Sequence, residues 1–277
     1  NAMDAAVFER RSSSIRPDEI LTLIYTSGTT GDPKGVELTH GNVMAVIEGC
    51  RHLIHWDEND VFLSLLPVSH VYERVTGYYL PLSEATCSAY VERNTLVEKL
   101  AKRPANFQEV RPTIFIGMPR LYEKMQEKIE DTARKGGPVK WRIFSWAVSV
   151  GKKVAYLTMR GRKPGPALAA QYKVADHLVF EKIRARLGGR TRFLVSGGAA
   201  LRDEVMEFYC AAGLTMIEGY GLTETTSVVS GNRPGCMRPG AVGFALHNTE
   251  VRIASDAELL VRGPGVMRGY WNNPDAT

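Results

Sequence analysis

Short apolar runs alternate with stretches of helical periodicity along most of this chain. The apolar runs are bounded by Pro, Gly, Ser or charged residues, which is the pattern typical of buried strands. They stand at Ile20–Ile24, Val61–Leu66, Cys87–Val91, Pro112–Gly117, Thr191–Ser196 and Thr215–Glu218, with a shorter strand at Val36–Thr39. Helical patterns lie between them, from His40 to His52, from Leu96 to Arg103, from Pro119 onward and from Arg202 onward. Because strands that alternate with helices form βαβ units, we predict an α/β fold with largely parallel sheets flanked by helices.

Composition and charge are those of an ordinary globular protein. The chain has 277 residues, of which 44% are hydrophobic and 23% charged, and its formal net charge is +5. No uncharged apolar run approaches the roughly 18 residues of a membrane span, and no segment has the pattern of a signal peptide. The four cysteines lie far apart, which favours reduced thiols and a cytoplasmic location. Asn1 and Ala2, which precede Met3, are interpreted as a tag remnant.

The stretch from Tyr25 to Val36 is rich in Ser, Thr and Gly and contains one lysine, Lys34. Glycines let the backbone turn with positive φ, and successive N–H groups in such a turn form a concave anion site. Hydroxyl groups and the lysine ammonium add further donors, so the stretch suits a polyphosphate. It is not a Walker A loop, since Pro33 and Gly35 occupy the positions of that motif's second Gly and its Ser or Thr. A hairpin turn without a ligand would also explain the composition.

Two further turns follow predicted strands. Gly197 and Gly198 stand at the carboxyl end of one strand, where open α/β sheets bind ligands, although a structural tight turn would explain them equally well. The second turn is Gly219-Tyr-Gly-Leu-Thr-Glu-Thr-Thr-Ser227. Its tyrosine offers a face for stacking, Thr223 a hydroxyl for a phosphate, and Glu224 the carboxylate that Mg²⁺ prefers.

These three motifs, in this order, resemble the signatures of the adenylate-forming enzymes, a family that includes acyl-CoA synthetases, firefly luciferase and the adenylation domains of peptide synthetases. The segment Glu258–Asp275 also resembles a segment of the family, except that Ala257 replaces a Gly, so an altered bend is expected there. The resemblance implies a lead-in at 1–19, an AMP-binding α/β core at 20–235 and the start of a smaller β subdomain at 236–277. It also implies that the family's ribose-binding Asp, hinge and C-terminal domain with its catalytic Lys are absent, so the chain is expected to be an inactive fragment.

The resemblance implies a two-step reaction with ATP, Mg²⁺ and coenzyme A. A carboxylate forms acyl-AMP and releases pyrophosphate, and the thiol of coenzyme A then displaces AMP. The residues implied for phosphate binding are Thr26, Ser27, Gly28, Thr29, Thr30, Gly31 and Lys34. Those implied for adenine are Gly197, Gly198, Ala199, Glu218, Gly219, Tyr220 and Gly221, with Thr223 on a phosphate. Those implied for Mg²⁺ are Thr26 and Glu224, and those implied for catalysis are Lys34, His70, Thr223 and Glu224.

The substrate class rests on two further strings. Ser69-His-Val-Tyr-Glu-Arg74 and Pro119-Arg-Leu-Tyr-Glu-Lys124 resemble the long-chain fatty acyl-CoA synthetases more than the aryl or amino-acid branches. His70 matches the family's histidine beside the acyl carboxylate, whereas a lone His after a strand is more often structural. An aryl acid, a carrier-protein acceptor or a nucleotide-binding module without turnover stays open as an alternative.

Residues 134–192 differ from the rest in charge. They contain fifteen Lys or Arg against only Asp176 and Glu181, and aromatic and aliphatic residues recur at helical spacing within them. A core-packed pair of helices with a solvated basic face is one interpretation. A surface that rests on anionic membrane is the other. Nucleic acid is not expected as a partner, because no recognised motif accompanies the charge.

Overall fold

The computed structural model describes residues 5–26, 32–91 and 105–277. Its largest sheet has seven strands in the order β4-β3-β5-β6-β7-β8-β9. The strands are β3 (Val61–Ser64), β4 (Cys87–Tyr90), β5 (Ile114–Gly117), β6 (Phe193–Ser196), β7 (Thr215–Tyr220), β8 (Ser230–Gly231) and β9 (Phe244–Ala245). Every pairing from β4 to β7 is parallel, and β8 and β9 extend the sheet with antiparallel pairs. The predicted α/β fold is therefore confirmed.

The first apolar run belongs to a different sheet. β1 (Ile20–Thr26) pairs with β2 (Lys34–Thr39), and β2 pairs with β12 (Gly269–Tyr270), all antiparallel. Within the predicted run Ile24 is buried and the other four residues are partly buried, so this strand is less buried than predicted. The stretch from Tyr25 to Val36 thus includes the end of β1 and the start of β2, which pair with each other.

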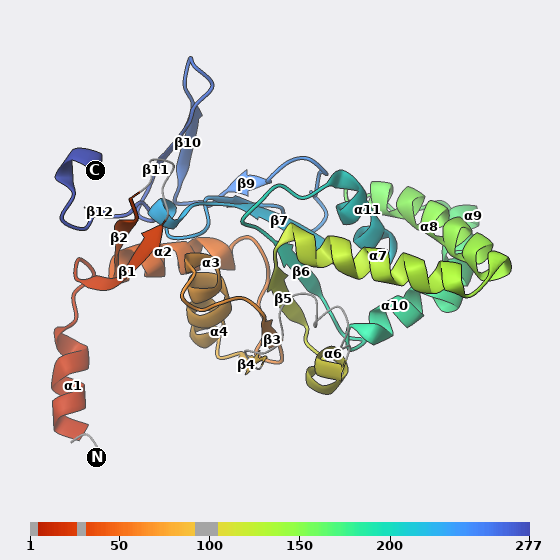
Figure 1. Cartoon of the computed structure of the whole chain (residues 1–277), viewed down its shortest axis with the longest axis horizontal. Coiled ribbons are helices and arrows are strands. Elements are labelled where there is room, and N and C mark those ends of the chain that lie inside the picture. Colours follow the sequence, from red (N-terminus) through yellow and green to blue (C-terminus); the bar gives the residue numbers. More distant parts are fainter. Residues whose placement is uncertain (1–4, 27–31, 92–104) are drawn as a thin grey trace.

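Helices cover both faces of the large sheet (Figure 1). The helices that follow β2 are α2 (His40–Arg51), α3 (Val71–Glu73), α4 (Leu80–Ser83), α6 (Ala105–Val110), α7 (Pro119–Lys135), α8 (Pro138–Thr158), α9 (Pro166–Ala175), α10 (Glu181–Arg186) and α11 (Asp203–Ala211). α1 (Ala5–Ser14) buries no residue and lies apart from the sheet, at the lower left of Figure 1. One apolar core joins α7, α8 and α11 to the sheet, and a second joins α2 and β2 to the opposite face. The helix predicted at 96–103 lies outside the described residues. Among the described residues, no helix combines the length and apolar character of a bilayer-spanning segment.

The last forty residues contribute to several parts of the structure. β10 (Glu250–Ile253) and β11 (Leu259–Arg262) form an exposed hairpin that projects at the top of Figure 1. Ala257 in its turn has a φ of 69° and donates its N–H to the carbonyl of Ala254. The hairpin thus turns through Ala257 in a conformation that glycine adopts more easily than alanine. Whether the bend differs from that of the family stays a prediction. The division at residue 236 stays a prediction.

A buried carboxyl group lies beneath the helical segment that begins at α3. A π-helical turn, Arg74–Tyr79, connects α3 to α4, and the Glu73 side chain lies against Gly77 in that turn. A Cβ on Gly77 would come within 2.5 Å of Glu73 Oε1, so the carboxyl occupies the space that the glycine leaves. Ser64 donates a hydrogen bond to Oε1, whereas Oε2 is buried and has no hydrogen-bond partner within residues 5–26, 32–91 and 105–277. Burial raises the pKa of Glu73 to about 7.

This raised pKa predicts a pH-dependent stability. Because the unfolded carboxyl has the lower pKa, 4.5, the native state binds the proton more tightly. The free energy of unfolding should then fall by about 3 kcal/mol as the pH rises from about 4.5 to about 7. In a Glu73→Gln variant this part of the pH dependence should vanish. Urea unfolding of both proteins at pH 5 and pH 8 measures it, and equal pH dependence in the two would contradict the prediction.

Candidate functional site

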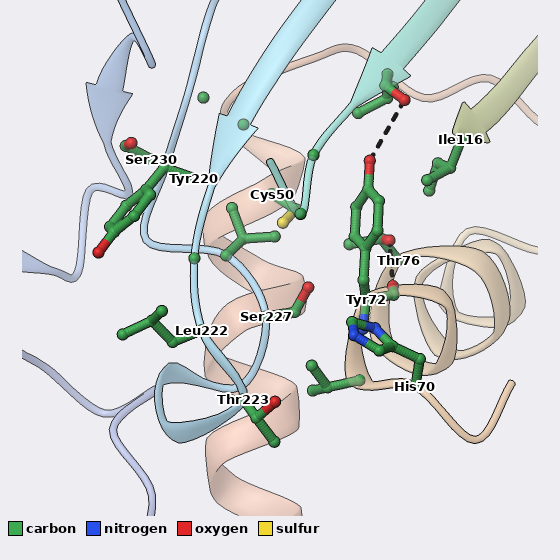
Figure 2. Close-up of a pocket in the computed structure, with 18 of the residues that line it drawn as sticks. Cys50, His70, Tyr72, Thr76, Ile116, Tyr220, Leu222, Thr223, Ser227 and Ser230 are labelled. Atoms are coloured by element: carbon green, nitrogen blue, oxygen red, sulfur yellow. Dashed lines mark hydrogen bonds between the residues drawn. The ribbon is translucent and has the colours of Figure 1, made fainter. Parts of the chain in front are cut away.

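A cavity of about 560 Å³ opens at the carboxyl ends of β5, β6 and β7. It reaches the β1–β2 hairpin on one side and α2 and α3 on the other, and Figure 2 shows part of its wall. The residues predicted from sequence that line it are Thr26, Lys34, His70, Gly197, Gly198, Gly219, Tyr220, Gly221, Thr223 and Glu224. Segments far apart in the sequence therefore meet at one site.

The polar end of the cavity is formed by the hairpin and by a 3₁₀ turn, Thr223–Thr225. Thr26 and Lys34 are cross-strand partners, so they hold the two ends of the loop together. Tyr270 completes this end, and its hydroxyl donates to Glu224 Oε1 at 2.8 Å. Burial, followed by the Glu224 carboxylate, raises the pKa of Tyr270 to about 12, so its hydroxyl stays protonated. A cation and a carboxylate are thus fixed at the same end of the cavity.

The turn after β7 is closed tightly. A Cβ on Gly221 would lie 1.4 Å from the carbonyl oxygen of Ser227, so any residue other than glycine would clash with the backbone at this position. Thr226 and Ser227 have positive φ values of 55° and 88°. Strain of this kind is retained where the surrounding structure over-determines it, often at ligand sites. Gly197, Gly198 and Tyr220 also line the cavity.

Two residues predicted to contact a cofactor lie outside the cavity wall. Glu218 is buried behind it, and its Oε1 accepts a hydrogen bond from the Leu201 N–H at 2.9 Å. Burial raises the pKa of this carboxyl above its usual value. Ala199 is exposed and does not line the cavity. The predicted phosphate-binding residues Ser27, Gly28, Thr29, Thr30 and Gly31 lie outside the described residues.

The other end of the cavity is mainly apolar. Its wall comes from α2 and the loop after it, from the helical segment beginning at α3, and from the sheet. The side chains are Cys50, Leu53, Ile54, Trp56, Val71, Tyr72, Thr76, Leu80, Ile116, Val195, Ile217 and Val228. Two polar atoms of the cavity wall, Trp56 Nε1 and Ser227 Oγ, are buried without a hydrogen-bond partner in the part of the chain that the structure describes. Such atoms are expected where a ligand or water completes a site.

His70 stands between the two ends. It begins α3, and its Nδ1 accepts the N–H of Tyr72 at 3.2 Å, which places the ring at the cavity (Figure 2). His70 is exposed. His70 therefore caps a helix and also lines the cavity, so the structural and functional interpretations are compatible.

Sequence reasoning missed Tyr270 and most of the apolar wall. Tyr270 lies forty-six residues after Glu224, and the two are brought together by the β2–β12 pairing and by hydrogen bonds between residues 265–267 and the Glu224 turn. The Gly-Tyr pair there belongs to a motif, but nothing in its spacing indicates its partner. The apolar wall combines positions from helices and strands, which periodicity assigns to the core in general.

The sequence matches the family model of the AMP-binding enzymes over residues 2–271. It is 38% identical over 278 residues to the long-chain-fatty-acid–CoA ligase FadD15 of Mycobacterium bovis, covering 100% of this chain and 45% of that protein. It is 36% identical to the peroxisomal long chain acyl-CoA synthetase 6 of Arabidopsis thaliana, covering 93% of this chain and 37% of that protein. The chain thus spans about half or less of the length of these curated relatives.

The fold is also similar to solved structures. A malonyl-CoA ligase, solved as a ternary product complex with methylmalonyl-CoA and AMP, matches with a TM-score of 0.64 and 26% identity. That match covers 95% of this chain and 47% of the other. The o-succinylbenzoate CoA synthetase of Bacillus subtilis, in complex with its acyl-adenylate intermediate, has a TM-score of 0.65 at 20% identity, covers 95% of this chain and 44% of that one, and supports the fold alone.

Proposed function

The chain belongs to the AMP-binding enzyme family, and we propose that it forms the nucleotide- and acyl-binding part of a cytoplasmic fatty acid–CoA ligase. One observation carries the proposal. A single cavity presents a lysine, a carboxylate and hydroxyl groups at one end and an apolar wall at the other. A fatty acid and ATP need such a pair of neighbouring environments, because the acyl chain is apolar and the triphosphate is charged.

The proposed reaction assigns a role to each end of the cavity. A carboxylate oxygen of the acid attacks the α-phosphorus of ATP, the bond to the bridging oxygen breaks, and pyrophosphate leaves. Lys34 and Thr26 would hold the β- and γ-phosphates, Tyr220 would stack on adenine, and His70 would border the acyl carboxylate. The thiol of coenzyme A would then attack the acyl carbon and release AMP. Positioning and charge neutralisation supply most of the catalysis in such transfers.

The donor set at the polar end fits Mg²⁺. Glu224 and Thr26 offer a carboxylate and a hydroxyl oxygen at the cavity, the kinds of ligand that this ion takes together with phosphate and water. A bound Mg²⁺ would offset charge on the phosphates. Glu224 would be its protein carboxylate, and Thr26 would offer a hydroxyl oxygen. Among the described residues, no group of three or more His, Cys, Asp or Glu side chains is placed to hold a metal ion.

ATP–pyrophosphate exchange tests the proposed reaction and its substrate class. A full-length enzyme that contains this chain is assayed with acids of increasing length, from acetate to stearate, and with benzoate as the aryl alternative. We expect exchange to be fastest with long-chain acids, since each CH₂ that becomes buried in the apolar end adds about 0.8 kcal/mol. Exchange with benzoate alone, or with none of these acids, would contradict the proposal. Thioester formation from purified acyl-AMP distinguishes coenzyme A from a carrier protein.

We also propose that α8 contacts anionic membrane. One face of this helix packs in the core through residues such as Phe144 and Val150, as the packing interpretation expects. Away from the core, α8 exposes Val139, Ile143, Trp146 and Tyr156 together with Arg142 and Lys153. Exposed apolar and basic side chains on one helix face are typical of helices that lie at a lipid surface. Some basic residues of the segment are not free for lipid, since Lys152 pairs with Glu207 and Arg184 with Asp176.

Vesicle sedimentation measures this contact. The protein should pellet with phosphatidylserine vesicles at low salt and be released at high salt. A double Arg142→Glu and Lys153→Glu variant should bind more weakly by about 30-fold or more, because each basic residue near such a surface contributes about 1 kcal/mol. Lys173→Glu with Lys182→Glu is the matched control on other helices. If the protein does not pellet at low salt, or if both double variants lose vesicle binding equally, α8 does not contact the membrane and only packs in the core.

A further inference from the structure

Tyr270 links the two charged groups of the polar end. Its hydroxyl donates to Glu224 Oε1 at 2.8 Å, and Lys34 Nζ lies 5.3 Å from the centre of its ring. A cation at this distance from an aromatic face is attracted by the ring's quadrupole. One side chain therefore contacts both the carboxylate and the lysine, which stand on different elements.

The backbone around Tyr270 is held on both sides. Residues 263–271, which we name the strap, run from the 3₁₀ turn of Glu224 to β2. At one end the Met267 N–H donates to the Glu224 carbonyl at 2.8 Å, and Thr226 Oγ1 donates to the Gly265 carbonyl at 2.7 Å. At the other, Trp271 N–H donates to the carbonyl of Gly35 at 2.7 Å.

The amino end of α2 supports the middle of the strap. Asn42 closes the capping box of α2 with Thr39, and its side-chain amide donates to the carbonyls of Pro264 and Val266 at 2.7 and 2.9 Å. The strap is thus attached to a helix, to the hairpin and to the Glu224 turn. These hydrogen bonds hold the backbone of the strap at three places, and they thereby set the position of the Tyr270 hydroxyl.

We propose that Tyr270 is a positioning residue that holds the Glu224 carboxylate in the orientation required to receive the metal of a metal–nucleotide complex. The Tyr270 hydroxyl fixes one oxygen of the Glu224 carboxylate. The Glu224 side chain is therefore already ordered before the metal binds and loses little rotamer freedom on binding. Outer partners of this kind orient metal-binding carboxylates, and their loss typically costs about 10–100-fold in metal affinity or activity. The inference rests on the proposed function, because it takes Glu224 as the metal carboxylate.

A Tyr270→Phe variant separates this role from packing. The phenyl ring keeps the contact with Lys34 and the strap, and only the hydroxyl is lost. Binding of the β,γ-imido analogue of ATP is measured by calorimetry on the 277-residue chain, with and without Mn²⁺, and Mn²⁺ binding is followed by electron paramagnetic resonance. We expect Mn²⁺ affinity in the presence of the analogue to fall about 10–100-fold. Analogue binding without metal should be unchanged.

Tyr209→Phe is the matched control, because its hydroxyl also donates a 2.8 Å hydrogen bond, to the carbonyl of Tyr122 in the core. It should leave Mn²⁺ affinity unchanged even if it lowers stability. In a Glu224→Gln background the Tyr270→Phe change should add little, since the two residues act through one contact. Unchanged Mn²⁺ affinity in Tyr270→Phe, or an equal loss in the control, overturns the inference. No metal-dependent analogue binding by the unaltered chain would overturn the proposed function instead.

Discussion

Replacing Glu224 by Gln is expected to lower ATP–pyrophosphate exchange by about 10²–10³-fold, the range that follows loss of one preorganised electrostatic contact. The amide keeps the size of the side chain and one oxygen that can accept from Tyr270 at the same place. It removes the charge that would attract the metal, and a bound metal contributes several kcal/mol of charge stabilisation in the transition state. Nucleotide affinity without metal should change far less than the exchange rate.

The control for this experiment is Glu250→Gln on the exposed β10–β11 hairpin. Glu250 also pairs with a neighbouring side chain, Arg262, and its loss removes the same charge at a distance from the cavity. Exchange is measured in a full-length enzyme at saturating Mg²⁺ and ATP. An unchanged rate in Glu224→Gln would show that this carboxylate has no part in the reaction.

A Gly221→Ala variant is expected to lose nucleotide binding and about 1–3 kcal/mol or more of stability. The new Cβ would stand 1.4 Å from the Ser227 carbonyl oxygen, and 2.4 Å from the carbonyl carbon. Both are backbone atoms, so no rotation of a side chain relieves the overlap. The turn must open, which would shift Tyr220 and the 3₁₀ turn that carries Glu224.

Gly165→Ala is the control for Gly221→Ala, because a Cβ at position 165 would meet no neighbouring atom. No heavy atom lies within 4 Å of the Cβ position there, and the φ of −65° suits alanine. Its thermal stability and its affinity for ATP should stay close to those of the unaltered chain. Thermal unfolding and a calorimetric titration with ATP measure both variants. Wild-type affinity in Gly221→Ala would show that the tight turn is unimportant for the site.

The central strands could be predicted because each is an apolar run bounded by turn residues. β5 and β6 are examples, since their buried side chains leave little choice of structure. The sheet that a strand joins is less predictable, because pairing depends on contacts distant in sequence. β1 shows this, since it pairs with β2 and, through β2, with a strand almost at the end of the chain.

In the candidate site, too, some residues could be predicted from local sequence and others depend on contacts between distant segments. Lys34, Gly221 and Glu224 stand in motifs whose residue types by themselves indicate a phosphate, a tight turn and a metal. Tyr270 could not be assigned a partner, because its contact with Glu224 arises from the strap and from strand pairing. Nor could the raised pKa of Glu73 be predicted, since that carboxyl becomes buried only when Gly77 leaves space for it.

A crystal structure with a palmitoyl-adenylate analogue, in which a sulfamoyl group replaces the phosphate, tests the shared cavity most directly. We predict adenine beside Tyr220, the sulfamoyl group between His70 and Thr223, and the acyl chain along the apolar wall toward Trp56. Density for the analogue elsewhere, or for the acyl chain outside the wall formed by α2 and α3, would contradict the proposal that one cavity holds both substrates.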